Sequence, residues 1–195
     1  MQGETSSARK VMVVAEPTRE SAVALQYALS HAVLEQDELV LLHVENPNSW
    51  RNTFTMFLRR PGAGSSSTMG CSDGGGGGED FVEEMKHACK AAQPKLRVHV
   101  ERVEILEGKD KASVILFQSM LLRIDLIIIG QRRSLSTAIL GCRRSGGSMR
   151  GTKGIDTAEY LIENSKCTCV GVQKKGQNAG FLLNTKTHKN FWLLA

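Results

Sequence analysis

Short apolar stretches and one alternating segment divide the chain into predicted β-strands. Four runs rich in β-branched residues cover 11–15, 39–44, 126–129 and 169–172. Continuous apolar runs of this length are typical of strands that are buried on both faces of a parallel sheet. Residues 96–105 instead alternate between apolar and polar positions, which predicts a fifth strand with one wetter face.

Helical periodicity fills the intervals between these strands. Apolar residues recur every three or four positions from 18 to 35, and Thr18 is a suitable N-cap for that helix. Further helices are predicted over 81–92, over 112–122 and after Asp156. Because strands and helices alternate, we expect parallel βαβ units and an α/β three-layer sandwich around a five-stranded, mostly parallel sheet.

The remaining segments define the predicted domain organisation. We expect a flexible N-terminus over 1–8, one α/β domain over 9–173 and an apolar C-terminal extension over 174–195. Two loops interrupt the domain: a Gly/Ser-rich segment over 59–78, expected to be disordered, and a basic segment over 142–153 that looks like an insertion. The apolar side chains of the extension need a surface to cover, which predicts a hairpin or edge strands docked on the domain.

Composition narrows the class of protein. The chain has 195 residues, of which 41% are hydrophobic, and a formal net charge of +5. These values suit an ordinary globular domain and exclude fibrous or wholly disordered chains. No apolar run is long enough to cross a bilayer and no hydrophobic leader is evident, so we expect no membrane partner and a cytoplasmic location, with the nucleus as the alternative. Five cysteines, an odd number, favour reduced thiols.

Candidate chemistry is expected where the strands end, because ligands of open parallel sheets bind at the carboxyl ends of the strands. Gly130 follows the fourth apolar run and would let backbone amides approach a phosphate closely. From Gln131 to Ile155 the chain carries six basic residues, five further glycines and no acidic residue. This composition suits an anion site in front of a helix, and it suits a solvated insertion equally well.

The order of these segments resembles the universal stress protein family, especially its plant members within the adenine nucleotide alpha hydrolase-like superfamily. The resemblance spans roughly 9–173 and rests on the runs KVMVVAEPTRESAVALQYALSHAV, DELVLLHV, DLIIIG and TAEYLIENSKC. It implies a parallel sheet in the strand order 3-2-1-4-5, homodimers that often pair through their last strands, and in one subclass an ATP site. The last strand here is 169–172, and the apolar extension offers another cover for that edge.

The same resemblance places candidate nucleotide-binding residues. The ATP-binding subclass has an acidic residue after its first strand, a backbone contact after its second, and the phosphate signature G-x2-G-x9-G-[ST] after its fourth. Glu16, Val44 and Gly130 occupy the first positions of these three features. Arg133 stands where the second glycine belongs, and Asp156 would direct a negative charge at the phosphates. ATP or AMP is therefore expected to bind weakly or not at all by the usual geometry.

Three functions remain open at this point. The leading hypothesis is a non-enzymatic stress or signalling module with a diverged nucleotide pocket and an unknown protein partner. The second is an adenine-nucleotide sensor that uses the basic loop as a phosphate cradle, with Arg132, Arg133, Gly147 and Ser148 as its candidate residues. The third is nucleic-acid binding through basic residues, which is disfavoured because stacking aromatics are lacking. No catalytic constellation or zinc-ligand spacing is recognisable, so Cys167 and Cys169 are interpreted as small buried residues.

Overall fold

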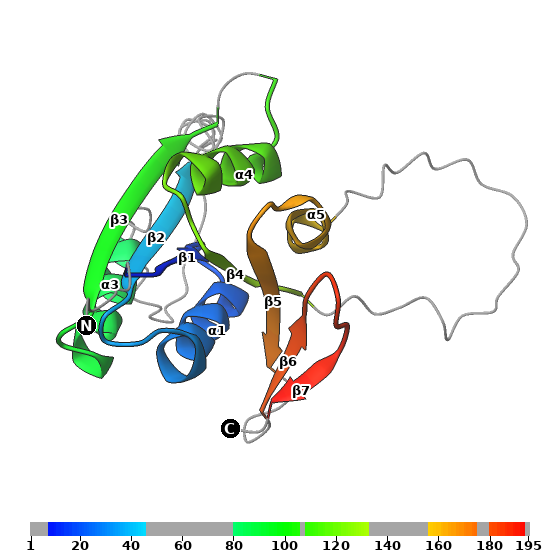
Figure 1. Ribbon diagram of the computed structural model, residues 1–195. Helices are drawn as coiled ribbons and strands as arrows, with labels where there is room; N and C mark the ends of the chain where they lie inside the picture. Colours follow the sequence, from blue (N-terminus) through cyan, green and yellow to red (C-terminus); the bar gives the residue numbers. More distant parts are fainter. Residues whose placement is uncertain (1–7, 46–79, 106–107, 133–155, 175–179, 194–195) are drawn as a thin grey trace, which may run out of the picture.

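Seven strands form one sheet in the order β3-β2-β1-β4-β5-β6-β7 (Figure 1). The computed structural model describes residues 8–45, 80–105, 108–132, 156–174 and 180–193. The first five strands in chain order are parallel neighbours, and the last two are antiparallel. This arrangement confirms the α/β fold and the order 3-2-1-4-5, extended by a C-terminal hairpin. The strands are β1 (Lys10–Val14), β2 (Glu38–Glu45), β3 (Arg97–Glu104), β4 (Leu126–Gly130), β5 (Thr168–Lys174), β6 (Phe181–Asn184) and β7 (Phe191–Leu193).

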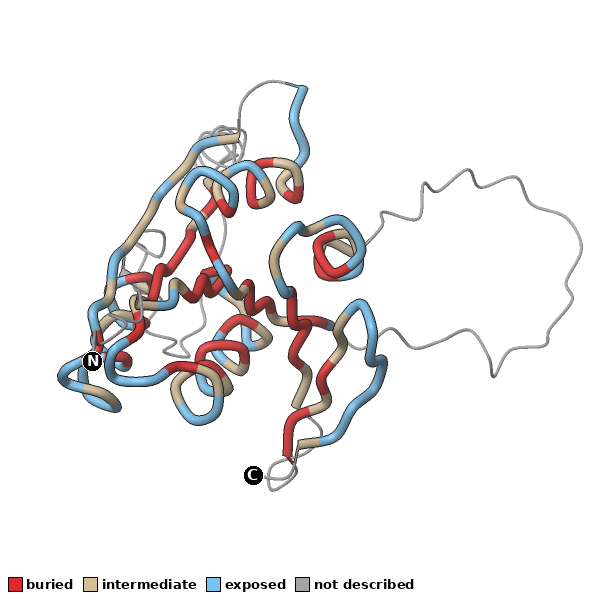
Figure 2. The backbone as a smooth tube through the Cα atoms, in the orientation of Figure 1, coloured by how far each residue is buried: buried red, intermediate tan, exposed pale blue. Residues whose placement is uncertain are grey.

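Helices cover both faces of the sheet and complete the three layers. They are α1 (Arg19–Tyr27), η1 (Ala28–Ala32), α3 (Asp80–Ala92), α4 (Lys111–Leu121) and α5 (Thr157–Asn164). Val11 and Val13 pack against α1 and α3, whereas Met12 and Val14 pack against α4 and α5. Because successive strand residues point to opposite faces, β1 contributes side chains to the hydrophobic core on each face of the sheet. Residues Val11 to Val14 are buried (Figure 2).

Side-chain caps begin three of these helices. Thr18 accepts a hydrogen bond from the N–H of Ser21 at the start of α1, as expected of an N-cap. Asp156 caps α5 through the N–H of Ala158, which confirms that the helix opens there. Asp110 caps α4 in the same way, a position that the apolar periodicity did not mark.

The first helix is shorter than its periodicity predicted. We expected it to reach residue 35, but α1 ends at Tyr27, the π-helical turn η1 follows, and Val33 is already extended. The buried carboxylate of Asp37 accepts the N–H of Leu34 (2.9 Å) and an N–H of Arg9 (2.8 Å). These bonds stabilise a turn at the point where the helix would otherwise continue.

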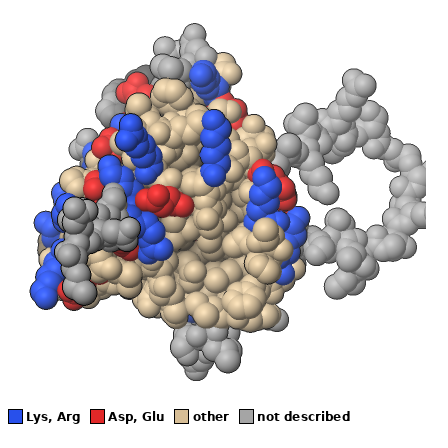
Figure 3. Space-filling view, viewed as in Figure 1, with Lys and Arg blue, Asp and Glu red and all other residues tan. Residues whose placement is uncertain are grey.

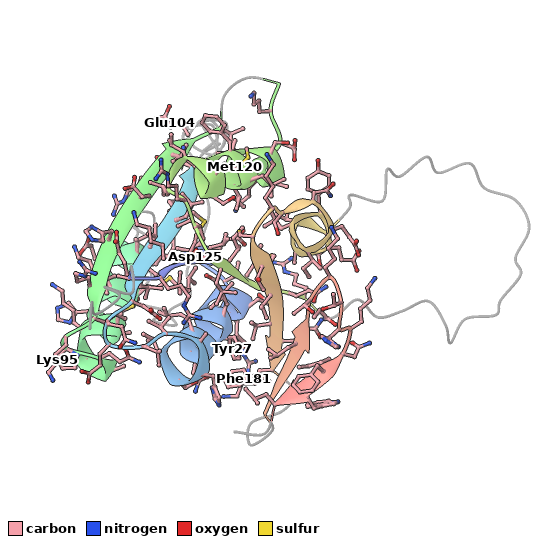
Figure 4. All side chains as sticks on the ribbon, in the orientation of Figure 1. Tyr27, Lys95, Glu104, Met120, Asp125 and Phe181 are labelled. Carbon is pink, nitrogen blue, oxygen red and sulfur yellow. The ribbon has the colours of Figure 1, made fainter. Side chains whose placement is uncertain are left out.

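The C-terminal extension docks as a hairpin, as predicted. The ring of Phe181 is buried against Tyr27 and His31, with both centroid separations at 5.4 Å (Figure 4). Not every apolar side chain of the extension is covered, since Phe191 and Trp192 stay 56% and 43% exposed. The expected flexible N-terminus falls almost wholly outside the described residues, and the loops 59–78 and 142–153 fall outside them entirely.

Candidate functional site

The candidate site lies at the carboxyl edge of the parallel strands, between β1 and β4. Connections diverge there, because β1 leads through α1 to β2 on one side and β4 leads through α5 to β5 on the other. Such a switch point is where open α/β sheets hold their ligands. Glu16, Val44 and Gly130 lie at this edge, at the ends of β1, β2 and β4 respectively.

Hydrogen bonds of ordinary length hold the turn that carries Glu16. The buried hydroxyl of Ser21 donates to the carbonyl of Val14 (2.9 Å) and accepts the backbone N–H of Glu16 (3.0 Å). Together with the cap from Thr18, these bonds hold the first turn of α1 against the end of β1. The side chain of Glu16 therefore leaves the strand from a fixed backbone position.

The carboxylate of Glu16 is already paired within the chain. Its Oε1 lies 2.5 Å from Nζ of Lys111, the first residue of α4, and the two side chains are 30% and 28% exposed. At this distance the positive charge of Lys111 offsets most of the field that the Glu16 carboxylate exerts on its neighbours. Sequence reasoning did not find Lys111, because no motif marks it at the start of α4 and it meets Glu16 only in the folded chain.

The backbone of Val44 faces the space beyond the end of β1. The Leu42 carbonyl accepts from the N–H of Ala15, which directly follows β1, and the Glu45 carbonyl accepts from the N–H of Ile105, which directly follows β3. Backbone groups of a strand alternate between its two neighbours, so the N–H and C=O of Val44 point toward β1 where that strand has ended. The Ala15 carbonyl next to it is bonded instead by a ring nitrogen of His43 (2.9 Å).

Gly130 is required by packing between a helix and a strand. A Cβ added to it would lie 2.3 Å from the backbone C and O of Glu20 and 2.8 Å from the N of Ser21. The first turn of α1 therefore occupies the space that a side chain would need. This contact gives the glycine a structural reason that is separate from the ligand approach predicted from the sequence.

Gln131, which follows Gly130 directly, is turned toward the C-terminal hairpin. The residue is 7% exposed, and its Oε1 accepts a hydrogen bond from Nδ2 of Asn184 (2.7 Å). Its backbone N–H donates to the carbonyl of Val172 (2.9 Å), which ties it to β5 as well. The exit of β4 is thus bonded across β5 to β6, a connection that no local sequence pattern indicated.

The cations predicted for a phosphate cradle are only partly described. Arg132 is 77% exposed on its side chain, and its Nε lies 4.0 Å from Oε2 of Glu20 in the first turn of α1. Arg133, Gly147 and Ser148 lie outside the described residues. The structure therefore brings Glu16, Val44, Gly130 and Arg132 to one edge and leaves the other three without a position.

A groove of about 560 Å³ opens beside Glu16, between α1 and α3. Its walls are mainly apolar and include Leu25 of α1, Leu29 of η1, and Phe81 and Met85 of α3. The ring of Phe81 also meets His43 edge to face, with centroids 4.9 Å apart. Phe81 therefore connects a wall of the groove to His43 of β2.

The thiols of the described residues are unsuited to nucleophilic or metal chemistry. Burial raises the pKa of Cys89 to about 11 and that of Cys169 to about 12, and it also raises the pKa of Cys167. Thiols whose pKa is raised in this way stay protonated at neutral pH, whereas the thiolate is the form that reacts and binds metals. Within the described residues, no three His, Cys, Asp or Glu side chains come together in a way that could hold a metal ion.

Comparison with known proteins identifies the fold. No family model and no curated protein matches the sequence. Among solved structures, a universal stress protein family member from Burkholderia pseudomallei aligns with 84% of this chain and 95% of its own, at 14% identity and a TM-score of 0.51. A universal stress protein family protein from Arabidopsis thaliana with AMP bound aligns with 86% of this chain and 93% of its own, at 14% identity and a TM-score of 0.52.

A universal stress protein in complex with cAMP aligns with 87% of this chain and all of its own length, again at 14% identity and a TM-score of 0.52. The chain therefore has a universal stress protein-like α/β fold. At this level of identity the likeness concerns the fold, and the nucleotides belong to those proteins. Along the described ranges, no helix combines the length and apolar character needed to cross a membrane.

Proposed function

We propose that this protein is a non-enzymatic stress or signalling module, similar to plant universal stress proteins, whose adenine-nucleotide pocket has diverged. The observation that carries the proposal is the ion pair between Glu16 and Lys111. The resemblance implies an acid after the first strand that serves the ligand in the nucleotide-binding subclass. Here a ligand that needs Glu16 must first displace a cation of the chain itself.

The cost of that displacement is modest. Breaking a partly exposed ion pair costs about 1 kcal/mol or less, which weakens binding by at most about fivefold. The hydrogen bond between Gln131 and Asn184 is a second feature that disfavours nucleotide binding, because the side chain that follows Gly130 contacts the hairpin rather than a ligand. Together these features support weak or absent binding of ATP or AMP by the usual geometry.

The second candidate is an adenine-nucleotide sensor, and the orientation of Val44 favours it. The Val44 backbone is directed into the space where the resemblance places adenine, and Arg132 is exposed at the same edge. Two proteins of this fold contain AMP and cAMP. A sensor of this kind would take its phosphate contacts from the basic loop, including Arg133, Gly147 and Ser148.

Calorimetric titration with ATP and AMP at physiological salt decides between the two candidates. We expect no saturable heat in the micromolar range for the wild-type chain, and no change for Glu16→Gln. Low-micromolar binding would contradict the proposal. If that binding were lost in Glu16→Gln and kept in Glu20→Gln, the sensor would replace the diverged module. Hydrogen exchange with and without nucleotide would then show whether the basic loop becomes protected.

The hairpin also bears on self-association. Strand β6 pairs antiparallel with β5 from Gly171↔Asn184 to Lys174↔Phe181. The outer edge of β5 is therefore occupied by the chain itself, and we propose that any homodimer uses another surface. A cytoplasmic or nuclear location and an unidentified protein partner complete the proposal, and nucleic acid remains the disfavoured partner.

A further inference from the structure

The two edges of the sheet differ in their chemistry. The eight-residue edge strand β3 carries charged side chains of both signs, including Arg97, Glu101 and Glu104. Charged residues along an edge strand discourage pairing with other chains. The opposite edge strand, β7, consists of Phe191, Trp192 and Leu193 and has no charge. Figure 3 shows Lys, Arg, Asp and Glu mixed along the β3 margin of the molecule.

The exposed aromatic side chains of β7 lie on opposite faces of the sheet. Phe191 is paired with Leu183, which belongs to the core on the α1 side, and Trp192 is paired with Leu182. Successive strand residues alternate between faces, so Trp192 points to the α5 side. A helix packed on one face would cover only one of the two rings. An extended segment placed alongside β7 would lie next to both.

The connection from β6 to β7 contains two lysines, Lys186 and Lys189, and no acidic residue. From Ser165 to Ala195 the sequence contains five lysines and no aspartate or glutamate. Lys186 and His188 are exposed in the connection between β6 and β7. Lys189 pairs with Glu163 of α5 at 3.4 Å, but the two side chains are 70% and 52% exposed, so the pair contributes little.

We propose that the β7 edge, defined as Phe191–Leu193 with the preceding turn 185–190, binds an acidic extended segment of a partner protein as an added strand. The partner's apolar residues would cover the two aromatic rings, and its carboxylates would meet Lys186 and its neighbours. A second copy of this chain is a poorer occupant, because its own hairpin offers no acidic residue. Single-stranded nucleic acid is poorer as well, because bases stack along one face of a sheet and the two rings lie on different faces.

The test measures peptide binding to the full chain. A labelled short peptide of alternating Glu and Val, its counterpart with Lys in place of Glu, and a short oligothymidylate are titrated by fluorescence anisotropy. We expect the acidic peptide alone to bind, less tightly as salt rises, and to protect the amides of 191–193 from hydrogen exchange. Lys186→Glu should weaken that binding by about fivefold. Trp192→Thr should weaken it further while the thermal midpoint stays near that of the wild type.

Lys95→Glu is the matched control. Lys95 is also an exposed lysine, with a side chain 80% exposed, and it lies at the far end of the molecule from the hairpin (Figure 4). Its substitution should leave peptide binding unchanged. The proposal is wrong if the acidic peptide fails to bind at millimolar concentration, if the basic peptide binds equally well, or if Lys95→Glu has the same effect as Lys186→Glu. Preferential binding of the oligonucleotide, or self-association that protects 191–193, would assign the edge to the corresponding other occupant and also overturn it.

Discussion

Replacing Gly130 by alanine tests whether this glycine serves the fold or a ligand. The added methyl carbon would lie 2.3 Å from the backbone of Glu20, whereas ordinary contacts begin near 3.4 Å. The first turn of α1 or the end of β4 must therefore move by about 1 Å. Neither can move cheaply, because Ser21 bonds that turn to Val14 of β1 and to Glu16.

Forced overpacking against backbone costs about 3 kcal/mol, which corresponds to a fall in melting temperature of about 6–12 °C for a domain of this size. Thermal and urea unfolding of the ligand-free chain, followed by circular dichroism, measure it directly. Gly108→Ala is the matched control, because Gly108 has φ +79° and no neighbouring atom within 4 Å. Its cost is the left-handed backbone alone, about 1 kcal/mol or 2–4 °C. The packing argument is refuted if Gly130→Ala melts within about 2 °C of the wild type.

Two further predictions follow from the titration of single groups. Hydrogen bonds from Ser113 hold the pKa of Asp110 below its ordinary value, so the folded state gains stability from the ionised cap above that value and loses it as the pH falls. Asp110→Ala should lower the melting temperature at pH 7, and Asp110→Asn should lower it less. The difference in melting temperature between Asp110→Ala and the wild type should shrink in acid. An equal difference at both pH values would contradict the role of the ionised cap. Burial raises the pKa of Cys169 to about 12. Cys169 should therefore resist alkylation at neutral pH in the native protein and lose this protection in denaturant. Site-resolved mass spectrometry after alkylation measures both rates. Because unfolding frees this thiol to ionise, stability should also decline above its ordinary pKa of 9.0, and fast native labelling would refute the burial.

Much of the architecture was predictable because buried parallel strands are read from local pattern. The apolar runs coincide with β1, β2, β4 and β5 except that the first run extends one residue past β1, and the alternating segment covers β3 with one more residue at each end. The end of the first helix was not predictable in this way. Apolar spacing continued past Tyr27, but the chain turns at Leu34 because Asp37 is buried beside Arg9. A contact between residues 28 positions apart leaves no mark in a local window.

The candidate site was predictable only as a location. Strand ends and the resemblance together indicated Glu16, Val44 and Gly130, and all three lie at the expected edge. Their partners were not indicated. Lys111 reaches Glu16 from a helix almost one hundred residues later, and Gln131 bonds to Asn184 of the hairpin. Electrostatic and hydrogen-bond partners of this kind depend on how layers meet, which periodicity does not encode.

The sequence by itself determined the strands, most helix limits, the order of βαβ units and the presence of a docked apolar extension, because each depends on spacing within a short window. Tertiary structure decided which charges neutralise one another at the carboxyl edge, why Gly130 has no side chain, and which aromatic rings of the extension are covered. Phe181 and Trp192 look alike in sequence, yet the first packs between Tyr27 and His31 and the second stays 43% exposed. The difference arises because β6 lies against α1 and β7 forms the edge of the sheet.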